Sequence, residues 1–139
     1  MDKVKTIMVV DGQGGGLGKA VIEKLREAGL GAEVVAVGTN SLATSAMMRA
    51  GATSAATGEN ALIYNAGIAD FIIGPIGMIS ANSMLGEISP AMAGAIASAG
   101  CMKLLIPLNK CNLYVGGVSE DSGISEKIDD IISKLRSML

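Results

Sequence analysis

The sequence predicts a single α/β domain of three layers, in which a mostly parallel sheet of five or six strands has helices on both faces. Short β-rich runs alternate with segments of helical apolar periodicity, and glycine-rich turns follow several of these runs. Half of the 139 residues are hydrophobic. Strands that alternate with helices of this length form parallel sheets, because each parallel crossover needs a helix. The length suits one domain, spanning residues 1–139.

The clearest elements are the first two strands and the helix between them. Residues 4–10 form a nearly continuous apolar run before a glycine cluster, which is typical of a buried parallel strand. Residues 17–28 place apolar side chains on one helical face and charged ones on the other. Gly29 stands where a left-handed C-terminal cap belongs. Residues 33–37 predict the second buried strand.

The next elements are shorter. A helix that Thr39 or Ser41 can cap ends at Gly51. Residues 52–56 predict a short third strand, and residues 59–65 predict a helix after it. Each of these segments continues the alternation of strand and helix.

The C-terminal half repeats the pattern. Residues 70–73 predict a strand, and Ser89 followed by proline is typical of a helix start. Residues 103–107 predict a further strand, and 112–117 an antiparallel strand at the edge of the sheet. Residues 124–138 carry an apolar stripe at helical spacing. We expect the strand order 3-2-1-4-5.

Composition excludes several classes of function. The net charge of −2 leaves no basic face for nucleic acid or anionic lipid. The absence of histidine removes imidazole-dependent catalysis and metal sites built on imidazole, so no metal is expected. The longest charge-free stretch has 16 residues and is interrupted by glycine and proline, whereas a membrane span needs about 20. Cys101 and Cys111 as free thiols suit a reducing compartment, so we expect a cytoplasmic protein.

Charge is distributed unevenly along the chain. Residues 34–102 carry only four charged side chains, Arg49, Glu59, Asp70 and Glu87. Broad apolar surface on a chain without membrane segments usually marks an interface. The sequence therefore predicts a homo-oligomer that associates through this charge-poor region.

The strongest functional signal is the glycine loop that joins the first strand to the first helix. Glycines allow a backbone to approach a ligand closely, and a helix start offers unpaired N–H groups to an anion. Gly12, Gly16 and Gly18 fit the spacing G-x-x-x-G-x-G, which resembles the fingerprint of short-chain dehydrogenases. The alternative is a turn whose glycines serve only strand–helix packing. The candidate phosphate-binding residues are Asp11, Gly12, Gln13, Gly14, Gly15, Gly16, Leu17 and Gly18.

Two neighbouring segments bear on the identity of the ligand. The end of the second strand reads Gly38-Thr39-Asn40, without the acidic residue that usually binds ribose hydroxyls, so NADP is favoured over NAD. Gly74 and Pro75 follow another strand at the same edge and join the candidate cofactor site.

Asp11 leaves two roles open. Its carboxylate can accept N–H bonds within the glycine turn, or it can contact a ribose, a metal or a sugar. A strand followed by an aspartate and glycines also resembles the first motif of methyltransferases. S-adenosylmethionine is therefore an alternative ligand.

Catalysis is less well defined than binding. Short-chain dehydrogenases need a tyrosine followed four residues later by lysine, but here those positions hold Ile68 and Val118. The remaining weak candidates for proton transfer are Glu59, Glu87, Lys110 and Cys111. A nucleotide-dependent enzyme and a non-catalytic ligand-sensing or scaffold oligomer both remain open.

Several of these peptides together resemble a family of short prokaryotic proteins, the domain-of-unknown-function family 3842. They are the glycine loop, Gly38-Thr39-Asn40, and residues 57–61, 73–77, 84–88 and 106–112. The likeness covers nearly the whole chain. It implies a Rossmann-like fold and supplies no activity, so it assigns no catalytic residue.

Overall fold

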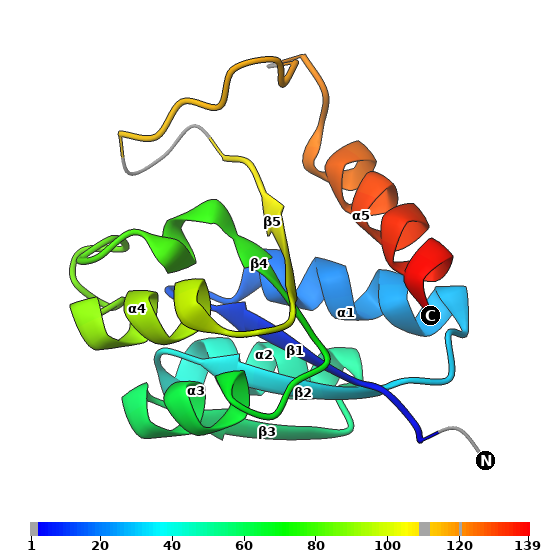
Figure 1. The fold of residues 1–139 in the computed structure, drawn as a ribbon, viewed down its shortest axis with the longest axis horizontal. Coiled ribbons are helices and arrows are strands. Elements are labelled where there is room, and N and C mark those ends of the chain that lie inside the picture. The colour runs from blue at the N-terminus through cyan, green and yellow to red at the C-terminus, as the bar shows by residue number, and fades with distance from the viewer. Residues whose placement is uncertain (1–2, 109–111, 120) are drawn as a thin grey trace.

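The computed structural model describes residues 3–108, 112–119 and 121–139, and it confirms the three-layer α/β architecture (Figure 1). The five strands of the sheet are all parallel, in the order β3-β2-β1-β4-β5. The strands are β1 (Thr6–Asp11), β2 (Glu33–Gly38), β3 (Ser54–Thr57), β4 (Phe71–Pro75) and β5 (Met102–Ile106). The helices are α1 (Gly16–Ala28), α2 (Ser41–Ala50), α3 (Glu59–Ala66), α4 (Pro90–Ser98) and α5 (Ile124–Met138), with a 3₁₀ turn, η1 (Ile76–Ile79).

The central strand β1 explains why its sequence is apolar throughout. Ile7 and Val9 point to the face covered by α1, α2 and α5, whereas Met8 and Val10 point to the face covered by α3 and α4. All four side chains are buried. A strand with helices on both sides has no solvated face, so polar residues cannot alternate with apolar ones.

Local signals at the helix ends behave largely as predicted. Gly29 ends α1 with φ 58°, a left-handed conformation that glycine adopts at little cost. Ser89 caps α4 with its hydroxyl, which accepts the N–H of Met92. The cap of α2 was assigned to the wrong residue: Asn40, between Thr39 and Ser41, accepts the N–H of Ala43 at 2.9 Å.

The predicted antiparallel strand at 112–117 is wrong. The residues described there form turns and irregular backbone. Asn112 and Gly117 have φ values of 56° and 83°, and left-handed residues at both ends of a six-residue segment break the extended conformation. Consequently β5 ends the sheet on that side, and the described part of the sheet is wholly parallel.

Helix α5 lies against α1, far from it in sequence (Figure 1). Ile128, Ile131 and Leu135 are buried in the core of that face, and Lys24 forms an ion pair with Asp129 at the border. The C-terminal helix therefore completes a layer that begins in the N-terminal quarter of the chain.

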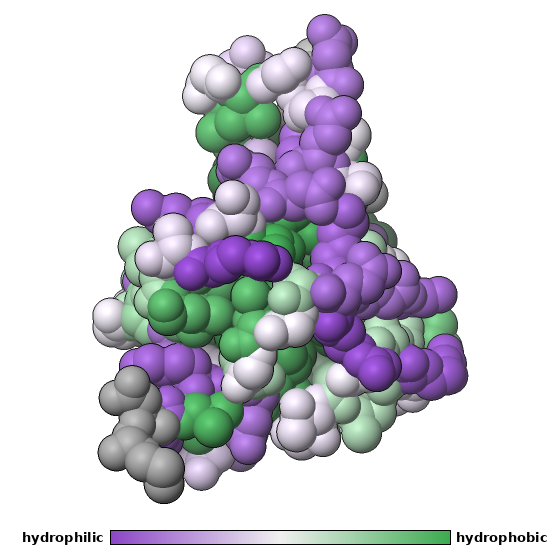
Figure 2. Space-filling model, turned by 90° about the vertical axis from the view of Figure 1, so that its right-hand side faces the viewer, coloured by the Kyte–Doolittle hydropathy of each residue, from purple (hydrophilic) through white to green (hydrophobic). Residues whose placement is uncertain are grey.

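Figure 2 shows the side of the molecule on which β1 begins, where apolar side chains lie in a recess bordered by hydrophilic ones. A hollow of about 250 Å³ there is lined by residues that include Ile7, Leu25 and Gly31. Among the described residues, no helix combines the length and apolar character that crossing a membrane requires.

Candidate functional site

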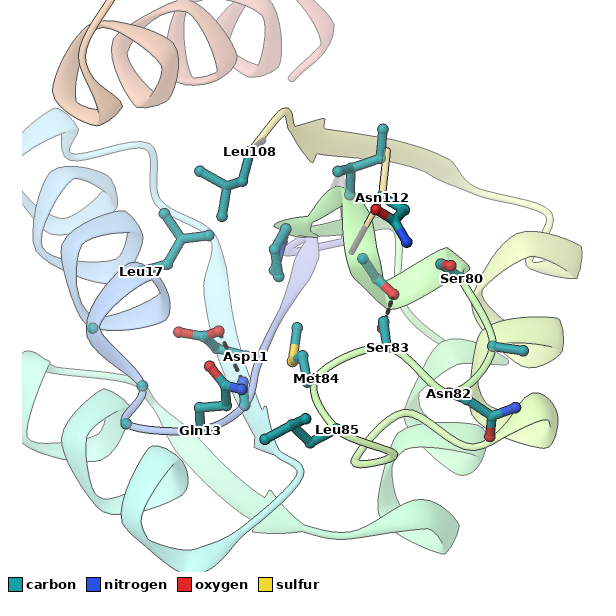
Figure 3. Close-up of a pocket in the computed structure, with 18 of the residues that line it drawn as sticks. Asp11, Gln13, Leu17, Ser80, Asn82, Ser83, Met84, Leu85, Leu108 and Asn112 are labelled. Atoms are coloured by element: carbon teal, nitrogen blue, oxygen red, sulfur yellow. Dashed lines mark hydrogen bonds between the residues drawn. The ribbon is translucent and has the colours of Figure 1, made fainter. Parts of the chain in front are cut away.

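A cavity of about 830 Å³ opens at the carboxyl end of β1, where open parallel sheets usually bind ligands (Figure 3). The glycine loop forms one wall, and the chain that follows β4 forms the opposite wall. The lining residues are 11–17, 75–77 and 80–85, together with Leu108, Asn112 and Ile124. Most of the predicted glycine-loop site therefore faces one cavity.

The buried carboxylate of Asp11 links the two ends of the glycine turn by hydrogen bonds. One carboxylate oxygen accepts the N–H of Gly12 at 2.8 Å, and the other accepts the N–H of Gly18 at 2.7 Å. The residue is only 5% exposed. Burial raises the pKa of this carboxyl, and the N–H groups of Gly18, Gly12 and Leu17 partly counteract the rise. The structure thus shows the first of the two roles considered for Asp11, acceptance of glycine N–H bonds.

The glycines of the loop fall into two groups. Gly12, Gly15 and Gly18 are needed for packing, because a Cβ at each position would lie 2.7 Å or less from a neighbouring atom. Gly15 also has φ 76°. Gly14 and Gly16 are exposed, and a Cβ on either would meet nothing within 4 Å. Packing therefore accounts for three of these glycines and leaves the two open ones unexplained.

Gly38 and Gly74 also serve packing. A Cβ on Gly38 would lie 2.6 Å from the backbone nitrogen of Thr44, and one on Gly74 would lie 2.7 Å from the carbonyl oxygen of Val10. Neither glycine lines the cavity, whereas Pro75 does.

Thr39 and Asn40, predicted to bind a ribose or its phosphate, lie beside the cavity and contact Glu87 instead. The carboxylate oxygen Oε1 of Glu87 accepts the Thr39 hydroxyl, the Asn40 side-chain amide at 2.8 Å and the Gln13 N–H at 2.9 Å. The hydroxyl of Thr39 is the main cause that lowers the pKa of Glu87, and the other two donors add to it. Glu87 is therefore a carboxylate held in its ionised form at the end of β2.

Sequence reasoning missed the segment 80–85, which forms the wall opposite the glycine loop (Figure 3). Asn82, Met84 and Leu85 have positive φ values of 66°, 57° and 56°. Left-handed backbone at Met and Leu has no composition signature, because these residues rarely adopt it. The buried hydroxyl of Ser83 donates to the carbonyl oxygen of Gly77 and holds this segment against η1.

The other candidates for proton transfer do not gather at the cavity. Glu59 begins α3 and accepts the Ser89 hydroxyl, outside the residues that line the cavity. Lys110 and Cys111 lie outside the described residues. Cys101 is half-buried, and burial raises the pKa of its thiol. Within the described part of the chain, no three His, Cys, Asp or Glu side chains are grouped to hold a metal ion.

A parallel sheet in this strand order, with a glycine loop that opens on a cavity at the carboxyl end of its central strand, defines a Rossmann-like α/β protein. The chain belongs to the family described as domain of unknown function 3842, whose family model matches residues 6–139. The resemblance drawn from the sequence motifs is thereby confirmed. No curated protein matches the chain.

Proposed function

We propose that the chain binds a phosphate-bearing nucleotide in the cavity, with a phosphate group against the glycine loop. The observation that carries this proposal is the pair Gly14 and Gly16, which are open to the cavity and have no packing role. Glycine at such positions allows a ligand to approach the backbone without meeting a side chain.

The start of α1 supports a phosphate as the bound group. The helix begins at Gly16, and its cap residue, Gly15, offers no side chain to satisfy the first N–H groups. Asp11 accepts the N–H of Gly18 within this first turn, and the positive end of the helix dipole favours a further anion at the N–H groups before it. A cavity of about 830 Å³ also lies within the size range of small-molecule sites.

NADP is the favoured ligand within this class. The end of β2 itself carries Thr39 and Asn40, which are neutral hydrogen-bond donors, in place of an acidic residue. The carboxylate that they hold, Glu87, comes from a separate segment of the chain. S-adenosylmethionine is the alternative, and no group of described side chains at the cavity assigns a reaction to either ligand. The proposal is therefore one of binding.

Substitution of Gly16 by valine is expected to abolish this binding while the protein remains folded. A Cβ at Gly16 meets nothing within 4 Å, so the loop has room for valine there, and its methyl groups would project where the phosphate would lie. At about 100 times its dissociation constant, a nucleotide adds roughly 2.7 kcal/mol to the free energy of unfolding. In a domain of this size that raises the melting temperature by roughly 10 °C. We expect the shift with NADP in the wild type and none in Gly16→Val.

Gly94→Val is the matched control, because Gly94 is an open glycine on α4, outside the cavity lining. The ligand panel is NADP, NAD, S-adenosylmethionine and ATP, read by thermal shift and by calorimetric titration. A panel that leaves the melting temperature of the wild type unchanged contradicts the proposal.

We also propose that two copies associate beside the edge strand β3. Both α2 and α3 contact β3, and each exposes large apolar side chains. Leu42 on α2 is 69% exposed, and Tyr64 on α3 is 66% exposed. These residues belong to the charge-poor region 34–102 and lie on opposite faces of the sheet, so the helices on both sides of the β3 edge expose apolar groups among few charges.

Light scattering at micromolar concentration is expected to give the mass of a dimer or larger oligomer. Replacement of Leu42 and Tyr64 by glutamate places like charges on the apolar surface and is expected to give the mass of one chain. Glutamate in place of the exposed Leu85, outside this surface, is the control and is expected to leave the mass unchanged. A wild-type protein with the mass of one chain contradicts this proposal.

A further inference from the structure

Three hydrogen-bond donors converge on one point beside the cavity. They are the N–H of Gln13 in the glycine loop, the hydroxyl of Thr39 after β2, and the side-chain amide of Asn40 at the start of α2. We call these three groups the donor cage. Its present occupant is a single carboxylate oxygen, Oε1 of Glu87, so the cage already holds an anion.

The donor cage has supports other than Glu87. The side-chain amide of Asn40 also donates to the carbonyl oxygen of Gln13 at 2.9 Å, and its oxygen accepts the N–H of Ala43. The backbone of Thr39 is fixed by an N–H bond to the carbonyl oxygen of Asp11 at 3.0 Å. Hence the donors are positioned by β1, β2 and α2, and an anion from another source would meet the same geometry.

The side chain of Glu87 can leave the cage without unfolding its surroundings. The segment before it is anchored elsewhere, by Ser83 on Gly77 and by the N–H of Asn82, which donates to the carbonyl oxygen of Ile88 at 2.7 Å. Ile88 is fully buried and holds the other side. Glu87 itself is only half-buried, so rotation of its side chain toward solvent exposes the three donors.

The cage and the cavity share one residue. Gln13 lines the cavity and supplies one cage donor, whereas Thr39, Asn40 and Glu87 do not line the cavity. A ligand whose phosphate lies on the glycine loop can therefore reach the cage only with a part that extends past Gln13 toward the end of β2. In a dinucleotide bound to this fold, the ribose of the adenosine half lies at the end of the second strand.

We propose that the donor cage is a binding site for a phosphate monoester on the ligand, and that Glu87 fills it as an internal competitor until the ligand displaces it. This inference rests on the proposed nucleotide binding and specifies the group that distinguishes NADP from NAD. A phosphate monoester carries close to two negative charges and three acceptor oxygens. Its three oxygens can accept hydrogen bonds from all three donors, whereas Glu87 accepts all three on a single oxygen.

Replacement of Glu87 tests whether this side chain competes with the ligand for the donor cage. If Glu87 fills the cage in about nine of ten molecules, the apparent dissociation constant for NADP is raised about tenfold. We expect Glu87→Ala to bind NADP about tenfold more tightly than the wild type in calorimetric titration, and to bind NAD within about twofold of the wild type. Glu87→Gln keeps the shape of the side chain and removes its charge. Its affinity for NADP is expected to lie between those of the wild type and Glu87→Ala. Glu27→Gln, on the exposed face of α1, controls for the change in net charge.

A second variant tests the donors themselves. Thr39→Val in the Glu87→Ala protein removes one donor and keeps the side-chain shape, so most of the tenfold gain for NADP is expected to disappear. Circular dichroism of each variant shows whether it is folded.

The outcomes separate the two proposals. Weaker binding of NAD by Glu87→Ala would mean that the carboxylate contacts ribose hydroxyls, and it overturns the inference. Equal affinities for NAD and NADP in both the wild type and Glu87→Ala also overturn it, while nucleotide binding stands. Failure of both nucleotides to bind to either protein overturns the proposed function and this inference together.

Discussion

Substitution of Gly18 by valine is expected to lower the free energy of unfolding by about 3 kcal/mol, because the first turn of α1 has no room for a side chain. A Cβ at Gly18 would lie 2.5 Å from the sulfur of Met47 and 2.9 Å from the Cβ of Asp11. Met47 is fully buried, so it cannot move aside into solvent. Urea denaturation measures the loss.

Gly16→Val, two residues earlier in the same loop, is the internal comparison. A Cβ at this position meets nothing within 4 Å, and the free energy of unfolding is expected to stay within about 1 kcal/mol of the wild-type value. Equal stability of the two variants would contradict the division of the loop into packed and open glycines.

Replacement of Asp11 by alanine is expected to lower the free energy of unfolding by about 2 kcal/mol at neutral pH. The carboxylate accepts the N–H groups of Gly12 and Gly18, and both lose their partner in the variant. A buried donor without a partner costs about 1–3 kcal/mol. The cost of burying the charge, which the variant removes, offsets part of this loss.

The difference in free energy of unfolding between the wild type and Asp11→Ala depends on pH through the pKa of Asp11. Burial raises the pKa in the folded state above the value of about 3.9 in an unfolded chain. At pH values between these two pKa values the folded state binds more protons than the unfolded state does. The contribution of Asp11 to the free energy of unfolding therefore decreases as pH rises through this range. The stability advantage of the wild type over Asp11→Ala should therefore grow as pH falls toward about 4. A difference that shrinks on acidification contradicts the raised pKa.

The elements that the sequence predicts well are those with local causes. The apolar run of β1 and the stripe of α5 follow from periodicity, and Gly29 and Ser89 mark helix ends through their own backbone or side chain. The strand predicted at 112–117 had a local signal as well, three apolar residues. It fails because the residues at both of its ends adopt left-handed backbone.

The candidate site was predictable only in part. The glycine loop carries its own signature, and most of it lies on the cavity. Spacing alone could not separate Gly14 and Gly16 from Gly12 and Gly18, because their different surroundings depend on Met84, Met47 and other residues distant in sequence. The contact of Glu87 with Thr39 joins residues 48 positions apart and arises from the strained segment before Glu87.

The packing of α5 on α1 has a consequence for the order of events during synthesis. Leu25 and Ile128 belong to the same core, and about 100 residues must be translated between them. At a translation rate of about 5–20 residues per second, α5 is synthesised roughly 5–20 s after the apolar side of α1 against which it packs. A chain released before α5 exposes this side of the sheet to other nascent chains and to chaperones. Burial of the α1 side chains that face α5 therefore has to wait until α5 itself has been translated.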